Sequence, residues 1–200
     1  MSAPSRLPLL HAALPCALVL LLAACGTTPP ARYYQLMPQS FTAPEQALAL
    51  SIGVGPVLWP EYLDRSQRVV RRGDVGLDLR EDERWAEPLE ASFNRVLREN
   101  LVRLTGNPQV IGFPWPLQER PARQVRMEVL RFDSDATGTA TLEARWQIVD
   151  AEGRALLPQR RQSRIVEPAQ GIGSDAAVAA QTRAVATLSR ELASALQGTR

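Results

Sequence analysis

The sequence predicts an α/β fold in which a mixed β-sheet carries two main helices packed on it. Apolar residues alternate at every second position in several short segments, which is typical of strands with one buried face. Two longer segments repeat apolar residues every three to four positions, as amphipathic helices do. The order along the chain is strands, helix, strands, helix, and 200 residues with 45% apolar composition suffice for one core.

Eight segments have the alternation or composition of strands. They are residues 32–37, 46–54, 68–72, 75–80, 109–113, 124–132, 140–148 and 155–166. We expect Gly55-Pro56 to end the second of them and Gly73-Asp74 to form a tight turn. The clearest is 140–148, whose predicted core face is Ala140, Leu142, Ala144, Trp146 and Ile148.

The two helices are predicted from longer repeats. Residues 88–104 form an amphipathic helix with Pro88 in its first turn, residues 84–87 leading into it and Gly106 ending it. The second helix begins with a cap at Ser174-Asp175 and presents an apolar stripe among many alanines.

The N-terminus resembles a bacterial lipoprotein signal. One arginine precedes an apolar stretch, residues 7–22, which closes with small residues before Cys25. We therefore expect a signal peptide over 1–24, an acylated Cys25 with an extended tether over 25–45, and one domain over 46–200. A transmembrane anchor is the alternative, but Pro8 and Pro15 interrupt the stretch. Gly26 after the cysteine resembles the pattern for export to the outer membrane, and the acyl chains hold the periplasmic domain there.

Cleavage before Cys25 would remove the chemistry most enzymes use. His11 is the only histidine, Cys16 leaves with it, and all 23 basic residues are arginine, so neither imidazole, free thiol nor lysine remains. We expect no metal and no cofactor. The formal charge of +2 also argues against a nucleic-acid partner.

Several local motifs resemble ligand sites but are better explained by turns and loops. Residues 133–138 open like a calcium loop, but Ala144 stands where the twelfth ligand should be, so a hairpin turn is favoured. Residues 171–176 have the glycine spacing of a dinucleotide site, yet the chain offers no second parallel strand after the helix.

Arginines cluster at 65–72 and 154–164. They form either solvated strand faces or contacts to lipid or a partner. Trp59, Phe113 and Trp115 lie beside prolines, either in the core or at an interface.

Larger motifs resemble the PqiC (YmbA) family of auxiliary lipoproteins of ABC-type and MCE-type transport systems. They are the lipobox and tether, Tyr33-Tyr34-Gln35-Leu36, residues 52–57 leading to Pro60-Glu61-Tyr62-Leu63-Asp64-Arg65, and Arg84-Trp85-Ala86-Glu87-Pro88-Leu89. Trp59 departs from the leucine that is commoner in the family.

The resemblance implies a fold similar to the TolB N-terminal domain and a non-enzymatic role. It implies an outer-membrane lipoprotein that docks a periplasm-spanning MCE-domain protein and supports lipid transport and membrane integrity. Self-association into homo-oligomers is compatible with that role. We expect the docking surface at Trp59, Tyr62, Leu63, Asp64, Arg65, Arg84 and Trp85. Two alternatives stay open. One is a lipid-anchored hydrolase using carboxylates among Glu81, Asp82, Glu83 and Glu87, and the other is a lipid carrier with its own cavity.

Overall fold

The computed structural model describes residues 30–199, and the predicted signal peptide and Cys25 lie outside the described residues. Residues 31–200 form one compact unit. The sheet comprises β1 (Arg32–Tyr34), β2 (Ile52–Leu58), β3 (Gln67–Arg72), β4 (Gly76–Trp85), β5 (Val110–Gly112), β6 (Arg123–Asp135), β7 (Ala140–Val149) and β8 (Arg161–Glu167). The helices are α2 (Leu89–Thr105) and α3 (Gly173–Gln197), with short 3₁₀ turns η1 (Glu61–Leu63) and η2 (Leu117–Glu119).

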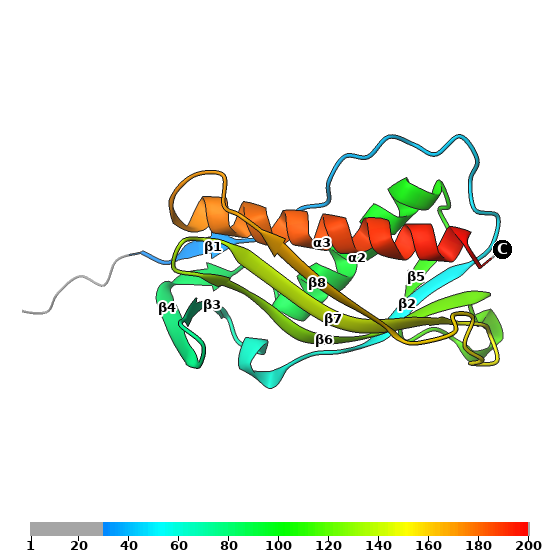
Figure 1. Cartoon of the computed structure of the whole chain (residues 1–200), viewed down its shortest axis with the longest axis horizontal. Coiled ribbons are helices and arrows are strands. Elements are labelled where there is room, and N and C mark those ends of the chain that lie inside the picture. The colour runs from blue at the N-terminus through cyan, green and yellow to red at the C-terminus, as the bar shows by residue number, and fades with distance from the viewer. Residues whose placement is uncertain (1–29, 200) are drawn as a thin grey trace, which may run out of the picture. The chain divides into compact units, whose positions relative to one another are not determined.

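The long strand β6 organises the sheet. On one side it pairs antiparallel with β7, which in turn pairs with β8. On the other side its first half pairs in parallel with β2 and its last residues pair with β3. β5 extends the sheet beyond β2, whereas β4 and then β1 extend it beyond β3. Both helices pack against each other and against the sheet (Figure 1), which confirms the predicted α/β class.

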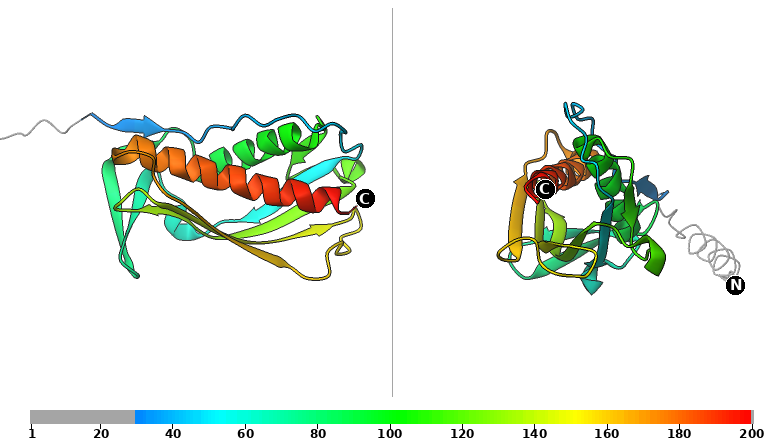
Figure 2. Two further views of the ribbon diagram at one scale, coloured as in Figure 1. Left: turned by 45° about the horizontal axis from the view of Figure 1, so that its top comes forward. Right: turned by 90° about the vertical axis from the view of Figure 1, so that its right-hand side faces the viewer.

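The core lies between the helices and the sheet. The predicted core face of β7 is confirmed, because Ala140, Leu142, Ala144, Trp146 and Ile148 are all buried. From α3 the matching apolar stripe includes Val185, Leu188 and Leu192. The views in Figure 2 show α3 lying along β7 and β8. Among the described residues, no helix is long and apolar enough to cross a membrane.

Four local predictions are wrong. Gly55-Pro56 does not end β2, because the register against β6 shifts between Val54 and Val57 and lets the strand continue to Leu58. Gly55 has a φ of +124°, and a Cβ there would lie 2.5 Å from the Cβ of Phe113, so only glycine fits.

Residues 84–87 do not simply lead into the helix, since Arg84 and Trp85 belong to β4, where they pair with Tyr33 and Tyr34 of β1. Ser174 does not cap α3. Its hydroxyl donates a hydrogen bond to Glu83 instead, and no side chain caps the helix. β8 also starts only at Arg161, because in the first half of the predicted 155–166 strand Ala155 makes only an isolated bridge to Val149 and residues 156–159 bend.

Part of the predicted tether belongs to the fold. β1 lies within residues 25–45, and Leu36 is fully buried. The backbone N–H of Leu36 donates to the Ser92 hydroxyl at 3.3 Å, and that of Gln39 donates to Asn100 Oδ1 at 3.1 Å. These contacts bind the segment before β2 to α2, so the domain begins near Arg32 and not at residue 46.

Candidate functional site

The connection between β2 and β3 carries most of the predicted docking residues. Trp59 follows β2 and packs its ring against Phe93 of α2, with centroids 5.4 Å apart, and against Phe132 of β6 at 6.1 Å. η1 comes next and buries Leu63. The aromatic contacts fix where the chain leaves β2, so the exposed residues after η1 are held at a defined place beside α2.

This connection forms one wall of a hollow of about 320 Å³, here called the connector hollow. Five of the predicted residues line it: Trp59, Leu63, Asp64, Arg65 and Trp85. The other wall is Glu87, which precedes α2, together with Leu89 and Glu90 of the first turn of α2. The structure therefore brings together residues from two sequence motifs that are about twenty positions apart.

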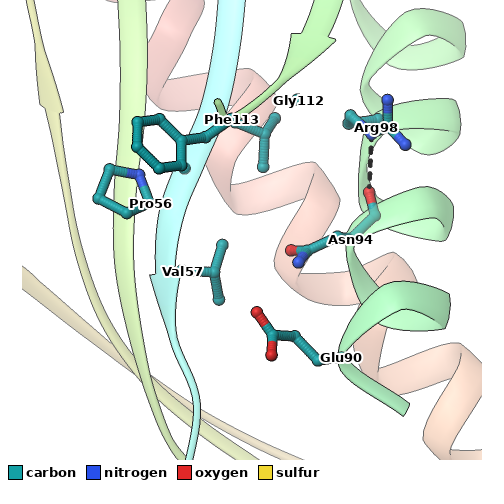
Figure 3. A pocket seen from close by; sticks show the side chains of 9 residues that line it. Pro56, Val57, Glu90, Asn94, Arg98, Gly112 and Phe113 are labelled. Atoms are coloured by element: carbon teal, nitrogen blue, oxygen red, sulfur yellow. Dashed lines mark hydrogen bonds between the residues drawn. The ribbon is translucent and has the colours of Figure 1, made fainter. Parts of the chain in front are cut away.

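A second hollow of about 370 Å³ adjoins the first and shares Glu90 with it. Figure 3 shows Glu90 and Asn94 reaching from α2 toward Val57 of β2. Within the described chain, β5 covers only residues 52–54 of β2, and the rest of that strand pairs with β6 alone. The two hollows together are called the α2 groove below. One side of it is the polar face of α2, and the other is the free edge of β2 with the connection to β3.

Several polar groups of the α2 groove have no partner among residues 30–199. The side chains of Asp64, Arg65 and Glu90 make neither an ion pair nor a hydrogen bond there. Two buried atoms, Trp59 Nε1 and Asn94 Oδ1, also lack a hydrogen-bond partner within this part of the chain. Buried polar atoms are normally paired, so these two are suited to a bound polar group.

Tyr62 and Arg84 do not line the groove. The Tyr62 hydroxyl donates to Asp133 Oδ2 at 2.9 Å and accepts the backbone N–H of Phe132 at 3.4 Å. Burial, followed by the negative charge of Asp133, raises the pKa of Tyr62 to about 12. Asp133 is fully buried and also binds Arg71 and Arg131. Tyr62 therefore belongs to a buried network that supports the connection. Arg84 lies half-buried in β4, and its Nε lacks a partner within the described residues.

The candidate carboxylates of a hydrolase do not converge on one site. Glu83 is buried and binds Arg68 at 2.5 Å and Arg32 at 3.1 Å. Glu87 accepts hydrogen bonds from Arg95 at 2.7 Å and from Gln35 at 3.0 Å.

These hydrogen bonds, that of Arg95 first, lower the pKa of Glu87 to about 2, which is the opposite of what a general acid needs. Glu81 accepts a hydrogen bond from Gln67, and Asp82 lies 3.8 Å from Arg32.

The two nucleotide- and metal-like motifs occupy turns. Residues 136–139 form the β6–β7 hairpin turn, in which Asp135 Oδ1 accepts the backbone N–H groups of Thr137 and Thr139. Gly171 lies in the loop before α3, and Gly173 is the first residue of that helix. Residues 30–199 contain no group of three or more His, Cys, Asp or Glu side chains placed to hold a metal ion.

Most of the clustered arginines bind acids of the same domain. Arg71 binds Asp133 at 2.8 Å, Arg72 binds Asp78 at 3.0 Å, and Arg164 binds Glu143 at 3.2 Å. Arg154 likewise binds Asp150, and Arg161 lies over the Trp146 ring.

The loop aromatic residues beside prolines include one, Phe113, that is largely exposed. Phe113 is 55% exposed at the edge of the groove and stacks edge-on against Trp115, with ring centroids 5.2 Å apart.

The sequence motifs did not point to Asn94, although Glu90, Asn94 and Arg98 recur every four positions and so share one face of a helix. That spacing is the signal that could have identified them as a row. Which neighbour the row faces depends on the position of β2, which only the structure provides.

Comparisons with known proteins agree with this fold. The chain matches the family model described as ABC-type transport auxiliary lipoprotein component over residues 34–193. The search of curated proteins gives no match. A crystal structure described as that of an uncharacterized protein is 21% identical, with a TM-score of 0.67, over 83% of this chain and 98% of the other.

A Xanthomonas campestris protein described as belonging to family DUF330 is 17% identical, with a TM-score of 0.68, over 84% of this chain and 96% of the other. At these identities the similarity shows the fold. The family model, in contrast, spans the β2–β3 connection, the α2 groove, all of α2 and most of α3, and on that basis the chain belongs to the family of ABC-type transport auxiliary lipoprotein components.

Proposed function

We propose that this lipoprotein is a non-enzymatic docking component, anchored by Cys25 in the outer membrane on its periplasmic face. It binds a periplasm-spanning MCE-domain protein of a lipid transport system through the α2 groove and so supports membrane integrity. The observation that carries the proposal is the convergence of Trp59, Asp64, Arg65 and Trp85 around one hollow. In the described chain, the charges of Asp64, Arg65 and Glu90 and the Trp59 Nε1 atom there lack partners.

The composition of the groove favours a protein partner. Apolar rings at its floor and unpaired charges at its rim are the arrangement of many protein interfaces. The free edge of β2 also offers backbone groups to which an extended segment could bond. Glu87 is paired with Arg95, and of the unpaired charges in the connector hollow Asp64 and Glu90 outnumber Arg65, so the complementary segment should carry basic residues.

Lipid carriage by the domain itself is less well supported. The hollows among the described residues include five of about 250 to 450 Å³, and each of these five has charged side chains in its lining. Acyl chains bind in predominantly apolar cavities. A partner that carries the lipid, held near the membrane by this protein, fits these surfaces better.

The test is binding of the purified MCE-domain protein to the full-length lipoprotein in detergent. Charge reversal by Asp64→Arg together with Glu90→Arg should weaken binding roughly tenfold or more, because like charges would then face the partner. Glu119→Arg, an exposed acidic residue away from the groove, is the matched control and should bind as the unmodified protein does. Unchanged binding of the double variant would place the interface elsewhere.

A further inference from the structure

The two most exposed large apolar side chains of the described residues are Val75, at 96%, and Ile172, at 97%. Val75 lies in the turn between β3 and β4, and Ile172 lies between two glycines immediately before α3. Neither side chain contributes to the core. A single exposed apolar residue is common on protein surfaces, so what matters is where these two lie and what else lies beside them.

Both tips lie at the same end of the domain. Figures 1 and 2 show the β3–β4 hairpin, β1 and the start of α3 gathered at that end. A hollow of about 450 Å³ joins the same elements, since its lining includes Arg32 of β1, Arg80 of β4 and Ile172. Tyr33, 67% exposed, adds a ring with a polar tip at this end, and such rings are common at membrane interfaces. We call this set, Tyr33, Val75 and Ile172, the tip surface.

The tip surface is also the end at which the chain comes from its lipid anchor. Arg32, the first residue of β1, follows Cys25 by seven positions. A fully extended chain covers at most about 3.6 Å per residue, so β1 starts within about 25 Å of the acylated residue. A surface so close to the anchor meets the bilayer at a high effective concentration.

We propose that the tip surface contacts the lipid bilayer, with Val75 and Ile172 inserted into its interface. Lipidation of Cys25 would then supply the attachment, and the tips would fix the orientation of the domain. This role is separate from docking of a partner, since none of the three residues lines the α2 groove.

The charges near the tips favour apolar insertion over attraction to anionic headgroups. Arg32, Arg72 and Arg80 lie in these elements with Asp74, Asp78, Glu81 and Asp82, and Asp175 is exposed in the first turn of α3. Arg72 binds Asp78 at 3.0 Å, and Arg32 lies 3.8 Å from Asp82. Because these acids outnumber the arginines, the contact does not depend on attraction to anionic headgroups and should persist at high salt.

The test uses the full lipoprotein in vesicles of phosphatidylethanolamine and phosphatidylglycerol. The mature sequence has no thiol other than that of Cys25, which acylation blocks, so single substitutions Val75→Cys and Ile172→Cys can each carry one environment-sensitive fluorophore. Glu152→Cys, exposed in the turn after β7, is the matched control. Thermal melting of each labelled protein verifies that it is folded.

We expect fluorophores at 75 and 172 to shift their emission to shorter wavelength and to lose intensity when the vesicles contain a spin-labelled lipid quencher. The fluorophore at 152 should do neither, and raising the salt concentration should change none of these results. Emission at 75 and 172 that matches the control would overturn the proposal. So would shielding from water without quenching by the lipid, because that outcome indicates coverage by a second copy or another protein.

Discussion

Replacing Tyr62 with phenylalanine separates a structural role of this residue from a role in docking. The substitution keeps the ring and removes only the hydroxyl, which donates to Asp133 at 2.9 Å and accepts a longer hydrogen bond from the Phe132 N–H at 3.4 Å. Hydrogen bonds to charged groups contribute about 1.5–3 kcal/mol to stability. Asp133 keeps the hydrogen bonds from Arg71 and Arg131, so the variant should lose an amount near the lower end of that range.

The measurement is the free energy of unfolding by urea at neutral pH. Tyr62→Phe should shift the midpoint without changing the slope, because the surface exposed on unfolding stays the same. For a domain of this size the melting temperature should fall by roughly 3–6 °C. The matched control is Tyr33→Phe, whose hydroxyl has no hydrogen-bond partner within residues 30–199, and it should leave stability unchanged.

The unfolding free energy at alkaline pH provides an independent check. The pKa of Tyr62 is raised from 10.0 to about 12 in the folded protein, so the protonated hydroxyl contributes stability below pH 10 that is lost as the pH rises through about 12. Over that window the difference in stability between the unmodified protein and Tyr62→Phe should shrink. A variant as stable as the unmodified protein at neutral pH, combined with weaker binding of the MCE-domain protein, would refute the structural role and return Tyr62 to the interface.

Three further substitutions test contacts elsewhere in the fold. Because the pKa of Glu87 is lowered from 4.5 to about 2, its carboxylate contributes stability above pH 4.5 that is lost as the pH falls toward 2. The difference in unfolding free energy between the unmodified protein and Glu87→Gln, measured at decreasing pH, should therefore vanish over that range. Ser163→Ala removes the acceptor of the buried Trp146 Nε1, 2.8 Å away, and should cost about 1–3 kcal/mol in urea unfolding. Asn100→Ala removes the acceptor of the Gln39 N–H, so hydrogen exchange of that amide should become roughly fivefold faster. An unchanged rate would show that other contacts hold the segment before β2.

Elements with a strong local period could be predicted from the sequence. β7 and α2 each bury a face that their own residues specify, and their predicted limits differ from the observed ones by about one residue. The failures involve distant partners. β2 continues past Pro56 because a bulge against β6 accommodates it, and Ser174 leaves the helix cap because Glu83, 91 positions earlier, accepts its hydroxyl.

The candidate site could likewise be predicted only in part from the sequence. The family resemblance singled out the motifs at 59–65 and 84–89, and five of the seven predicted residues line one hollow. It could not show that Tyr62 turns toward Asp133, since that contact joins residues 71 positions apart. Nor could it show that Asn94 faces the free edge of β2, because β5 stops short of covering that edge.

The two proposed surfaces constrain each other through β4. The strand starts at Gly76, beside the tip residue Val75, and ends at Trp85, which lines the α2 groove. Ten residues in a strand rise about 3.3 Å each, so the two surfaces lie at most about 33 Å apart along it. A protein docked in the groove would then sit within one strand length of the bilayer that the tips contact. For a periplasm-spanning partner, only a segment at its membrane-proximal end could reach that position, and this is where its basic docking residues should be sought.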